Sequence, residues 1–160
     1  MYLGTSDFAI REELVLKIAI LAERYATEYS WYVDVILQLI RDAGDHVSEE
    51  VWYRVIQIVA NHRDLQPYAA RMVLKTLQGP LWHETALKIG AYLLGEYGDS
   101  ICTEAGCSPV EQFRALHQNK FAISSPQTKA LLMSAYIKLL NLFPELRRDV
   151  RNCFFVCGKL

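Results

Sequence analysis

The sequence lacks any apolar run approaching the roughly 20 residues that a membrane-spanning helix needs. It also lacks an excess of either charge: 17 Lys and Arg face 18 Asp and Glu, so overall charge does not favour a nucleic-acid or anionic-membrane partner. The opening residues, "MYLGTSDFAIREE", lack the basic start and apolar core of a secretory signal. A hydrophobic share of 52% excludes the disordered class. We therefore expect a folded cytosolic protein that does not bind nucleic acid.

Closely spaced cysteine pairs are also missing. The four cysteines, Cys102, Cys107, Cys153 and Cys157, have C-x4-C and C-x3-C spacings, and no histidine lies close to either pair. Zinc sites usually contain tighter C-x2-C pairs. The prediction is reduced thiols, with no metal and no obligatory disulfide.

No catalytic constellation is recognisable. His83-Glu84 begins a sequence in which a zinc protease would need a second histidine where Leu87 stands. The glycines in "GAYLLGEYG" follow no strand and lack the Gly-Lys-Ser/Thr end of a phosphate loop. Close helix packing is the predicted use of Gly90 and Gly95, and helix termination that of Gly98. We predict a protein that is not an enzyme, with no catalytic, cofactor-binding or metal-binding residues and no cofactor.

Four aromatic residues, Trp31, Tyr32, Trp52 and Tyr53, raise the alternative of a ligand cage or a stacking platform. Neighbouring positions on a helix point about 100° apart, so neither Trp-Tyr pair is expected to form one stacked surface. Core packing is the favoured interpretation. The one local charge excess, Arg147, Arg148 and Arg151, is interrupted by Asp149 and is typical of a solvated helix face.

Period-two alternation between turn signals is absent, whereas helix start and stop signals recur. Helices are expected to start at Ser6-Asp7, at Ser48, at Ser108-Pro109 with Glu111 in a capping box, and at Ser125-Pro126. They are expected to stop at Gly44, Gly79-Pro80 and Gly98. The prediction is an all-α chain of about eight helices, at 7–25, 30–43, 49–62, 65–78, 84–97, 109–118, 126–142 and 145–153.

The predicted helices repeat in pairs. Their first members start near residues 7, 49, 84 and 126, a spacing close to the period of HEAT and armadillo arrays. We therefore expect an alpha-solenoid, a right-handed stack of antiparallel helix pairs.

Polar residues on these helices lie on narrow stripes. Glu50, Arg54, Gln57 and Asn61 share one face of their helix, and the rest of that helix is apolar. A helix wetted along one stripe packs between the repeat before it and the repeat after it. The stripe is a candidate for partner contact or for solvent exposure, and partner-binding residues stay unassigned.

Several blocks of the chain resemble one protein family: "IREELVLKIAILAERYA", "WYVDVILQLIRDAGDHVSEEVWYRVIQIVAN", "DLQPYAA" and "HETALKIGAYLLGEYG". They are similar to the trunk of the alpha-adaptins, the large alpha subunits of the plasma-membrane clathrin adaptor (adaptor protein complex 2). The resemblance divides the chain into a trunk-like region, 1–146, and a divergent tail, 147–160. "WYVD" followed by "VSEEVWYRVIQIV" resembles the alpha type more than the gamma type.

The resemblance implies a structural role in clathrin-mediated endocytosis and intracellular protein transport. The implied partners are beta-type large, medium and small adaptor chains, with membrane association at the inner face of the plasma membrane only through the complex. The alternatives are the trunk of another adaptor, gamma-type, or a generic helical-repeat binding module such as a karyopherin-like piece.

Parts of the family pattern are missing. The chain resembles a mid-trunk fragment without the basic phosphoinositide-binding cluster, the segment near the dileucine-cargo site, the hinge or the appendage, so no lipid, cargo or accessory residues carry over. Its end, "RRDVRNCFFVCGKL", departs from the family and exposes an apolar "CFFVC". That departure fits a truncated product, a splice product or a gene-model fragment. We expect apolar surface at both ends to promote association.

Overall fold

Helices dominate the computed structural model, which describes residues 3–118 and 120–157. Short 3-10 turns at Gly44–His46, Arg63–Leu65, Gly98–Ile101 and Pro144–Leu146 join some of them. The described residues contain no strand. The α-helices are α1 (Leu3–Tyr25), α2 (Tyr29–Ala43), α3 (Glu49–Asn61), α4 (Gln66–Gln78), α5 (Glu84–Tyr97), α6 (Pro109–His117), α7 (Pro126–Leu142) and α8 (Arg147–Cys157).

The predicted all-α fold and its six middle helices are confirmed to within one residue at each end. The two terminal helices differ from the prediction. Helix α1 begins at Leu3, upstream of the proposed Ser6-Asp7 start, and Asp7 forms an ion pair with Arg11 one turn later at 3.0 Å. Helix α8 begins after a 3-10 turn and continues to Cys157. The start at Ser6-Asp7 was therefore wrong.

Three of the proposed helix starts fall at the right residue, but only two make the capping bond. Ser108 accepts a hydrogen bond from the Glu111 N–H, and Glu111 accepts one from the Ser108 N–H at 3.0 Å, which completes the capping box. Ser125 accepts from the Thr128 N–H at 3.3 Å. Ser48 stands at the start of α3 in an extended conformation, yet its hydroxyl is buried without a partner among the described residues.

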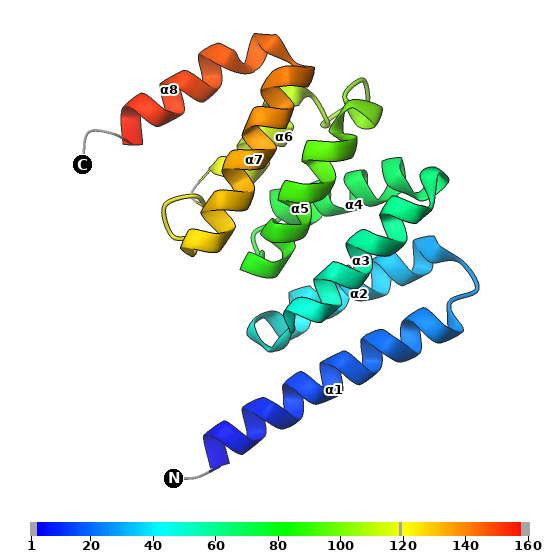
Figure 1. The fold of residues 1–160 in the computed structure, drawn as a ribbon. Helices are drawn as coiled ribbons and strands as arrows, with labels where there is room; N and C mark the ends of the chain where they lie inside the picture. The colour runs from blue at the N-terminus through cyan, green and yellow to red at the C-terminus, as the bar shows by residue number, and fades with distance from the viewer. Residues whose placement is uncertain (1–2, 119, 158–160) are drawn as a thin grey trace.

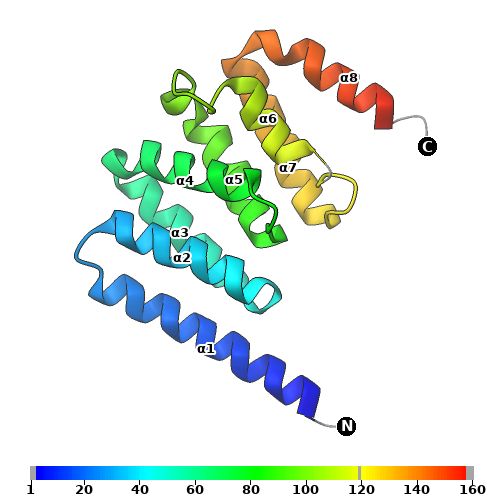
Figure 2. The ribbon, with the colours of Figure 1, turned by 180° about the vertical axis from the view of Figure 1, so that it is seen from behind.

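The helices form two layers (Figures 1 and 2). Helices α1, α3, α5 and α7 follow one another in the first layer, and α2, α4 and α6 follow one another in the second. Helices α1 to α5 therefore each pack on the next member of their own layer, and α1 packs on α2, α3 on α4 and α5 on α6. This is the arrangement of a HEAT-like helical repeat, as the pair spacing predicted.

One continuous core runs between the layers, and glycines let its helices approach closely. A Cβ at Gly95 would lie 3.3 Å from the Ala135 Cα, so α5 and α7 pack nearly backbone to backbone there. A Cβ at Gly90 would collide with Leu77 of α4. The close-packing interpretation of both glycines is confirmed. The largest fully buried side chains are Tyr32, Ile36, Ile40, Leu74, Leu77, Leu87, Ile89, Leu93, Leu94, Ile101, Phe113 and Tyr136.

Polar contacts join successive repeats at sequence separations close to the repeat period. Arg54 of α3 contacts Glu23 of α1 at 2.5 Å, 31 residues away, and the Tyr68 hydroxyl of α4 donates to Asp34 of α2, 34 residues away. Because these groups are partly exposed, each pair stabilises the fold by a fraction of a kcal/mol to about 1 kcal/mol. Equivalent contacts are Glu49 with Lys88, Arg71 with Glu104, Glu84 with Ser125 and Thr128, and Glu96 with Lys138.

The core-packing prediction is right for two of the four aromatic residues and wrong for the other two, and the expectation that neither Trp-Tyr pair stacks is wrong for one pair. Tyr32 and Trp52 are buried in the core, whereas Trp31 and Tyr53 are half exposed. The Trp52 and Tyr53 rings do stack, with centroids 4.0 Å apart and an angle of 25°. Long side chains fold back along a helix, so their rings can meet although their Cβ atoms diverge. Since Trp52 is buried, the pair still offers no open platform for a ligand.

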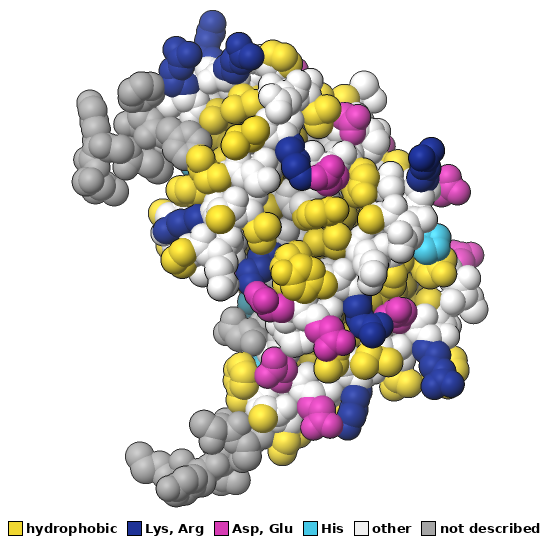
Figure 3. Space-filling view, viewed as in Figure 1, with side chains coloured by type: hydrophobic (Ala, Val, Ile, Leu, Met, Phe, Trp, Pro, Cys, Tyr) yellow, Lys and Arg dark blue, Asp and Glu magenta, His cyan; other side chains and the backbone are white. Residues whose placement is uncertain are grey.

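One edge of the molecule is hollowed (Figure 3). The connections that precede α3, α5 and α7 lie along this edge, at the left in Figure 1. Gly44, in the first of these connections, adopts a φ of 49° and lies so close to His83 in the second that a Cβ would collide with the imidazole. A residue without a side chain is required at this contact.

Candidate interaction surface

The residues considered for catalysis have structural contacts. Glu84 of the "HETAL" sequence faces α7, where its carboxylate accepts hydrogen bonds from Ser125 and Thr128. Leu87, in the position that a second zinc ligand would need, is buried. Among the described residues, no three His, Cys, Asp or Glu side chains lie close enough to hold a metal ion. None of the described helices is long and apolar enough to cross a membrane.

The cysteines lie in ordinary packing positions. Cys107 is buried near the start of α6, and burial raises the pKa of its thiol. Cys102 is half buried, and neither Cys102 nor Cys107 forms a disulfide. The side chain of Cys157 lies outside the described residues, so the prediction for that pair stays a prediction.

The residues of the polar stripe of α3 fall into two groups, one that contacts the preceding repeat and one that is exposed. Arg54 is half buried and pairs with Glu23 of the preceding repeat, while Glu50, Gln57 and Asn61 are exposed. Tyr53 is 57% exposed beside them, so the wetted face is wider than the sequence pattern indicated. Arg54 therefore holds repeats together, and the other three residues remain available for contact.

The outer surface of α1 carries a second, apolar candidate. Five large side chains are exposed along it, and on a helical wheel they fall within about 80°. Leu14 is 55% exposed and Leu21 53% exposed, whereas Val15, Ala19 and Ala22 face α2 and α3. We name this surface the α1 face, comprising Ile10, Leu14, Ile18, Leu21 and Tyr25.

The α1 face continues into a groove against α2. The groove has a volume of about 450 Å³ and includes Ile18, Trp31 and Leu39. Asp34 and Asp42 stand at its polar margin. An exposed apolar strip of this kind is typical of a protein-contact surface.

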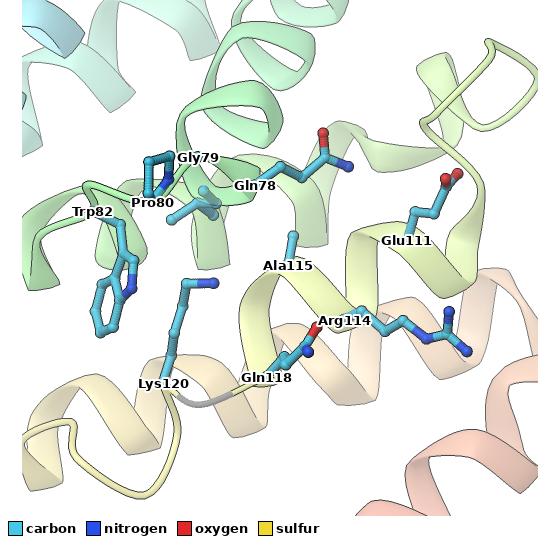
Figure 4. A pocket seen from close by; sticks show the side chains of 10 residues that line it. Gln78, Gly79, Pro80, Trp82, Glu111, Arg114, Ala115, Gln118 and Lys120 are labelled. Carbon is cyan, nitrogen blue, oxygen red and sulfur yellow. The ribbon is translucent and has the colours of Figure 1, made fainter.

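A smaller pocket, of about 390 Å³, lies between the α4–α5 connection and α6 (Figure 4). Trp82 and Lys120 lie together on one side of it, and Arg114 points away from them on the other side. The Lys120 side chain is only 6% exposed, and its ammonium lies 5.4 Å from the centroid of the Trp82 ring. Burial lowers the pKa of this ammonium group. No sequence pattern indicated the pocket, because Trp82 and Lys120 come from two separate connections.

Known proteins similar to this chain are described as adaptor subunits. The chain matches the family described as "Adaptin N terminal region" over residues 1–159. It is 55% identical over 153 residues to "AP-2 complex subunit alpha-2" of Dictyostelium discoideum and 53% identical over 157 residues to "AP-2 complex subunit alpha-1" of Arabidopsis thaliana. Each alignment covers 96% of this chain and 15% of the relative.

A relative of a different adaptor type is more distant. The identity to "AP-1 complex subunit gamma-2" of Arabidopsis thaliana is 28% over 161 residues, covering 94% of this chain and 19% of the relative. The similarity therefore favours the alpha type over the gamma type. The chain spans less than a fifth of the length of these curated relatives.

Proposed function

Because this chain belongs to the adaptin N-terminal region family, we propose that it serves as part of the helical scaffold of the large alpha subunit of the plasma-membrane clathrin adaptor. The observation that carries the proposal is the difference in identity: 52% or more to AP-2 alpha subunits of Dictyostelium and Arabidopsis, against 28% to an AP-1 gamma subunit. The proposed role is structural, in clathrin-mediated endocytosis, and involves no catalytic step.

The proposed partners are the other adaptor chains: the beta-type large, medium and small subunits. The cellular site would be the cytoplasmic side of coated pits, reached through the complex. Two features support a role in contact: the exposed apolar α1 face, and the exposed Glu50, Gln57 and Asn61 of α3. In a solenoid each repeat contacts chiefly its neighbours, so this part can keep its own fold and present these surfaces.

Affinity capture tests the proposal. The tagged chain, incubated with cytosol, is expected to recover beta-type, medium or small subunits of the plasma-membrane adaptor, with a complete alpha trunk as the positive control. A Leu14→Glu, Leu21→Lys double variant tests whether capture depends on the α1 face. Ile123→Lys is its matched control, because Ile123 is 72% exposed and lies off that face.

Recovery of gamma-type adaptor partners alone would contradict the alpha assignment. Recovery of nuclear-transport partners alone would favour a generic helical-repeat binding module. Circular dichroism of both variants checks that loss of capture is not loss of folding.

A further inference from the structure

The pocket beside Trp82 contains the ammonium group of a largely buried lysine, which has no negative partner among the described residues. Lys120 is 6% exposed, and within residues 3–118 and 120–157 no carboxylate forms an ion pair with its ammonium group. A buried lysine is ordinarily paired, because desolvation of a single charge is costly. The Trp82 ring offsets part of that cost through its negative π-face.

Glu111, the acidic residue in the pocket lining, does not act as the negative partner of the Lys120 ammonium group. Glu111 is used at the start of α6, where it accepts hydrogen bonds from the Ser108 N–H at 3.0 Å and the Ser108 hydroxyl at 2.8 Å. These bonds lower the pKa of Glu111, so it stays ionised in that role. Figure 4 shows Glu111 and Arg114 directed away from Lys120.

We propose that this pocket binds an aliphatic carboxylate, whose oxygens accept hydrogen bonds from the Lys120 ammonium while its methylene groups pack on Trp82. One ammonium group matches one negative charge, and a phosphate dianion would leave a second charge without a partner beside Lys120. Leu77, Pro80 and Ala115 form the apolar part of the remaining wall, on which a short apolar stem can pack, and Gln78 and Gln118 are among its polar residues. The volume of about 390 Å³ accommodates a single acidic residue.

The carboxylate can come from an acidic side chain of a protein segment or from a free small acid, and both share this chemistry. The pocket lies between the α4–α5 connection and α6, and its lining includes neither the α1 face nor the polar stripe of α3. The proposal is therefore independent of the scaffold role, and the isolated chain with small ligands tests it without any adaptor subunit.

The experiment is a ¹H–¹⁵N titration of the tryptophan indole signals. The chain has three tryptophans, and a Trp82→Phe variant assigns the Trp82 signal. N-acetyl-glutamate N-methylamide represents the side chain of a protein segment, glutarate represents a free acid, and N-acetyl-glutamine N-methylamide is the uncharged isostere. We expect a saturable shift of the Trp82 signal with a carboxylate and binding weaker by about tenfold or more with the isostere.

Two variants separate Lys120 from general surface charge. Lys120→Met is expected to weaken carboxylate binding by about tenfold or more, whereas Lys75→Met, at an exposed lysine of α4 outside the pocket, is expected to leave it unchanged. Unchanged Trp31 and Trp52 signals confirm that the variants fold. The comparison of carboxylate with isostere needs no variant at all.

The proposal is overturned if the isostere and the carboxylate shift Trp82 equally, or if inorganic phosphate binds more tightly than either carboxylate. If glutarate alone shifts the Trp82 signal, the pocket is a carboxylate site for free acids. A shift produced by the capped glutamate assigns it to protein segments.

Discussion

At the scale of single residues, polar side chains join successive repeats at defined positions. Glu84 meets Ser125 and Thr128, and Arg71 meets Glu104. Each of these contacts depends on how its two helices are rotated against each other. The hydrogen bonds of Glu84 and Gln112 have the clearest predicted effects on stability.

Glu84 should make stability depend on pH. Burial raises the pKa of Glu84, but hydrogen bonds from Ser125 and Thr128 and the charge of Lys88 outweigh that effect, so the folded-state pKa lies below the ordinary value of a glutamate. Its contribution is therefore complete above the unfolded pKa and is lost as pH falls through the lower folded value. Glu84→Gln is expected to cost about 1 kcal/mol at neutral pH and progressively less in acid, measured by urea denaturation across pH.

The matched control is Glu145→Gln, at an exposed carboxylate for which no described hydrogen bond or ion pair is found. It should change stability by less than about 0.5 kcal/mol. A pH-independent difference between Glu84→Gln and the unaltered chain would contradict the ionised-acceptor interpretation.

Gln112 is a buried polar residue that sequence reasoning missed. Its side-chain amide donates to the Gly98 and Cys107 carbonyls at 2.8 Å each, and the residue is 0% exposed. Gln112→Leu would leave two buried acceptors without donors, which should cost about 2–4 kcal/mol. Urea denaturation measures this, and the exposed Gln57→Leu on α3 should stay within about 0.5 kcal/mol of the original stability. Equal losses in the two variants would contradict the assigned role.

At the scale of the helix, the sequence predicted most of the structure because start and stop residues act locally. Gly44, Gly79 and Gly98 end their helices as expected, and Pro109 and Pro126 begin theirs. The additional residues of α1 were missed because no N-cap residue precedes Leu3 in the sequence. The additional residues at the end of α8 were missed although Gly158 directly follows Cys157 in the sequence. The pocket was missed for a different reason: Trp82 and Lys120 are brought together by packing between two connections.

The caps give a direct comparison between two serines that each stand immediately before a helix. Ser108→Ala removes the bond from the Glu111 N–H and should destabilise the chain by about 1 kcal/mol. Ser48→Ala removes a buried hydroxyl that lacks a partner, so it should be neutral or slightly stabilising. Thermal unfolding followed by circular dichroism measures both. Equal destabilisation by the two substitutions would show that Ser48 also forms its cap.

At the scale of the whole molecule, the exposed apolar α1 face should control association. A strip of large apolar side chains of this extent on a solenoid favours contact with another surface. We expect the isolated chain to self-associate at tens of micromolar in analytical ultracentrifugation, and Leu21→Lys to weaken that association by about tenfold or more. The side chains of Phe154, Phe155 and Val156, once expected to contribute at the other end, lie outside the described residues.

Ile123→Lys adds the same charge at a 72% exposed position in the α6–α7 connection and should leave association unchanged. A monodisperse monomer at those concentrations would contradict the prediction that the α1 face promotes self-association. Equal effects of both lysine substitutions would assign association to net charge rather than to the α1 face.

The contact between Gly44 and His83 links the curvature of the helical array to the residue at one position. The two connections touch on the hollowed edge, so the space that Gly44 leaves empty helps to set how tightly successive repeats bend toward each other. A Cβ at Gly44 would overlap the His83 imidazole, so a larger residue there requires that side chain or its connection to shift. In a nearest-neighbour array, a shift between two connections changes the placement of every repeat that follows.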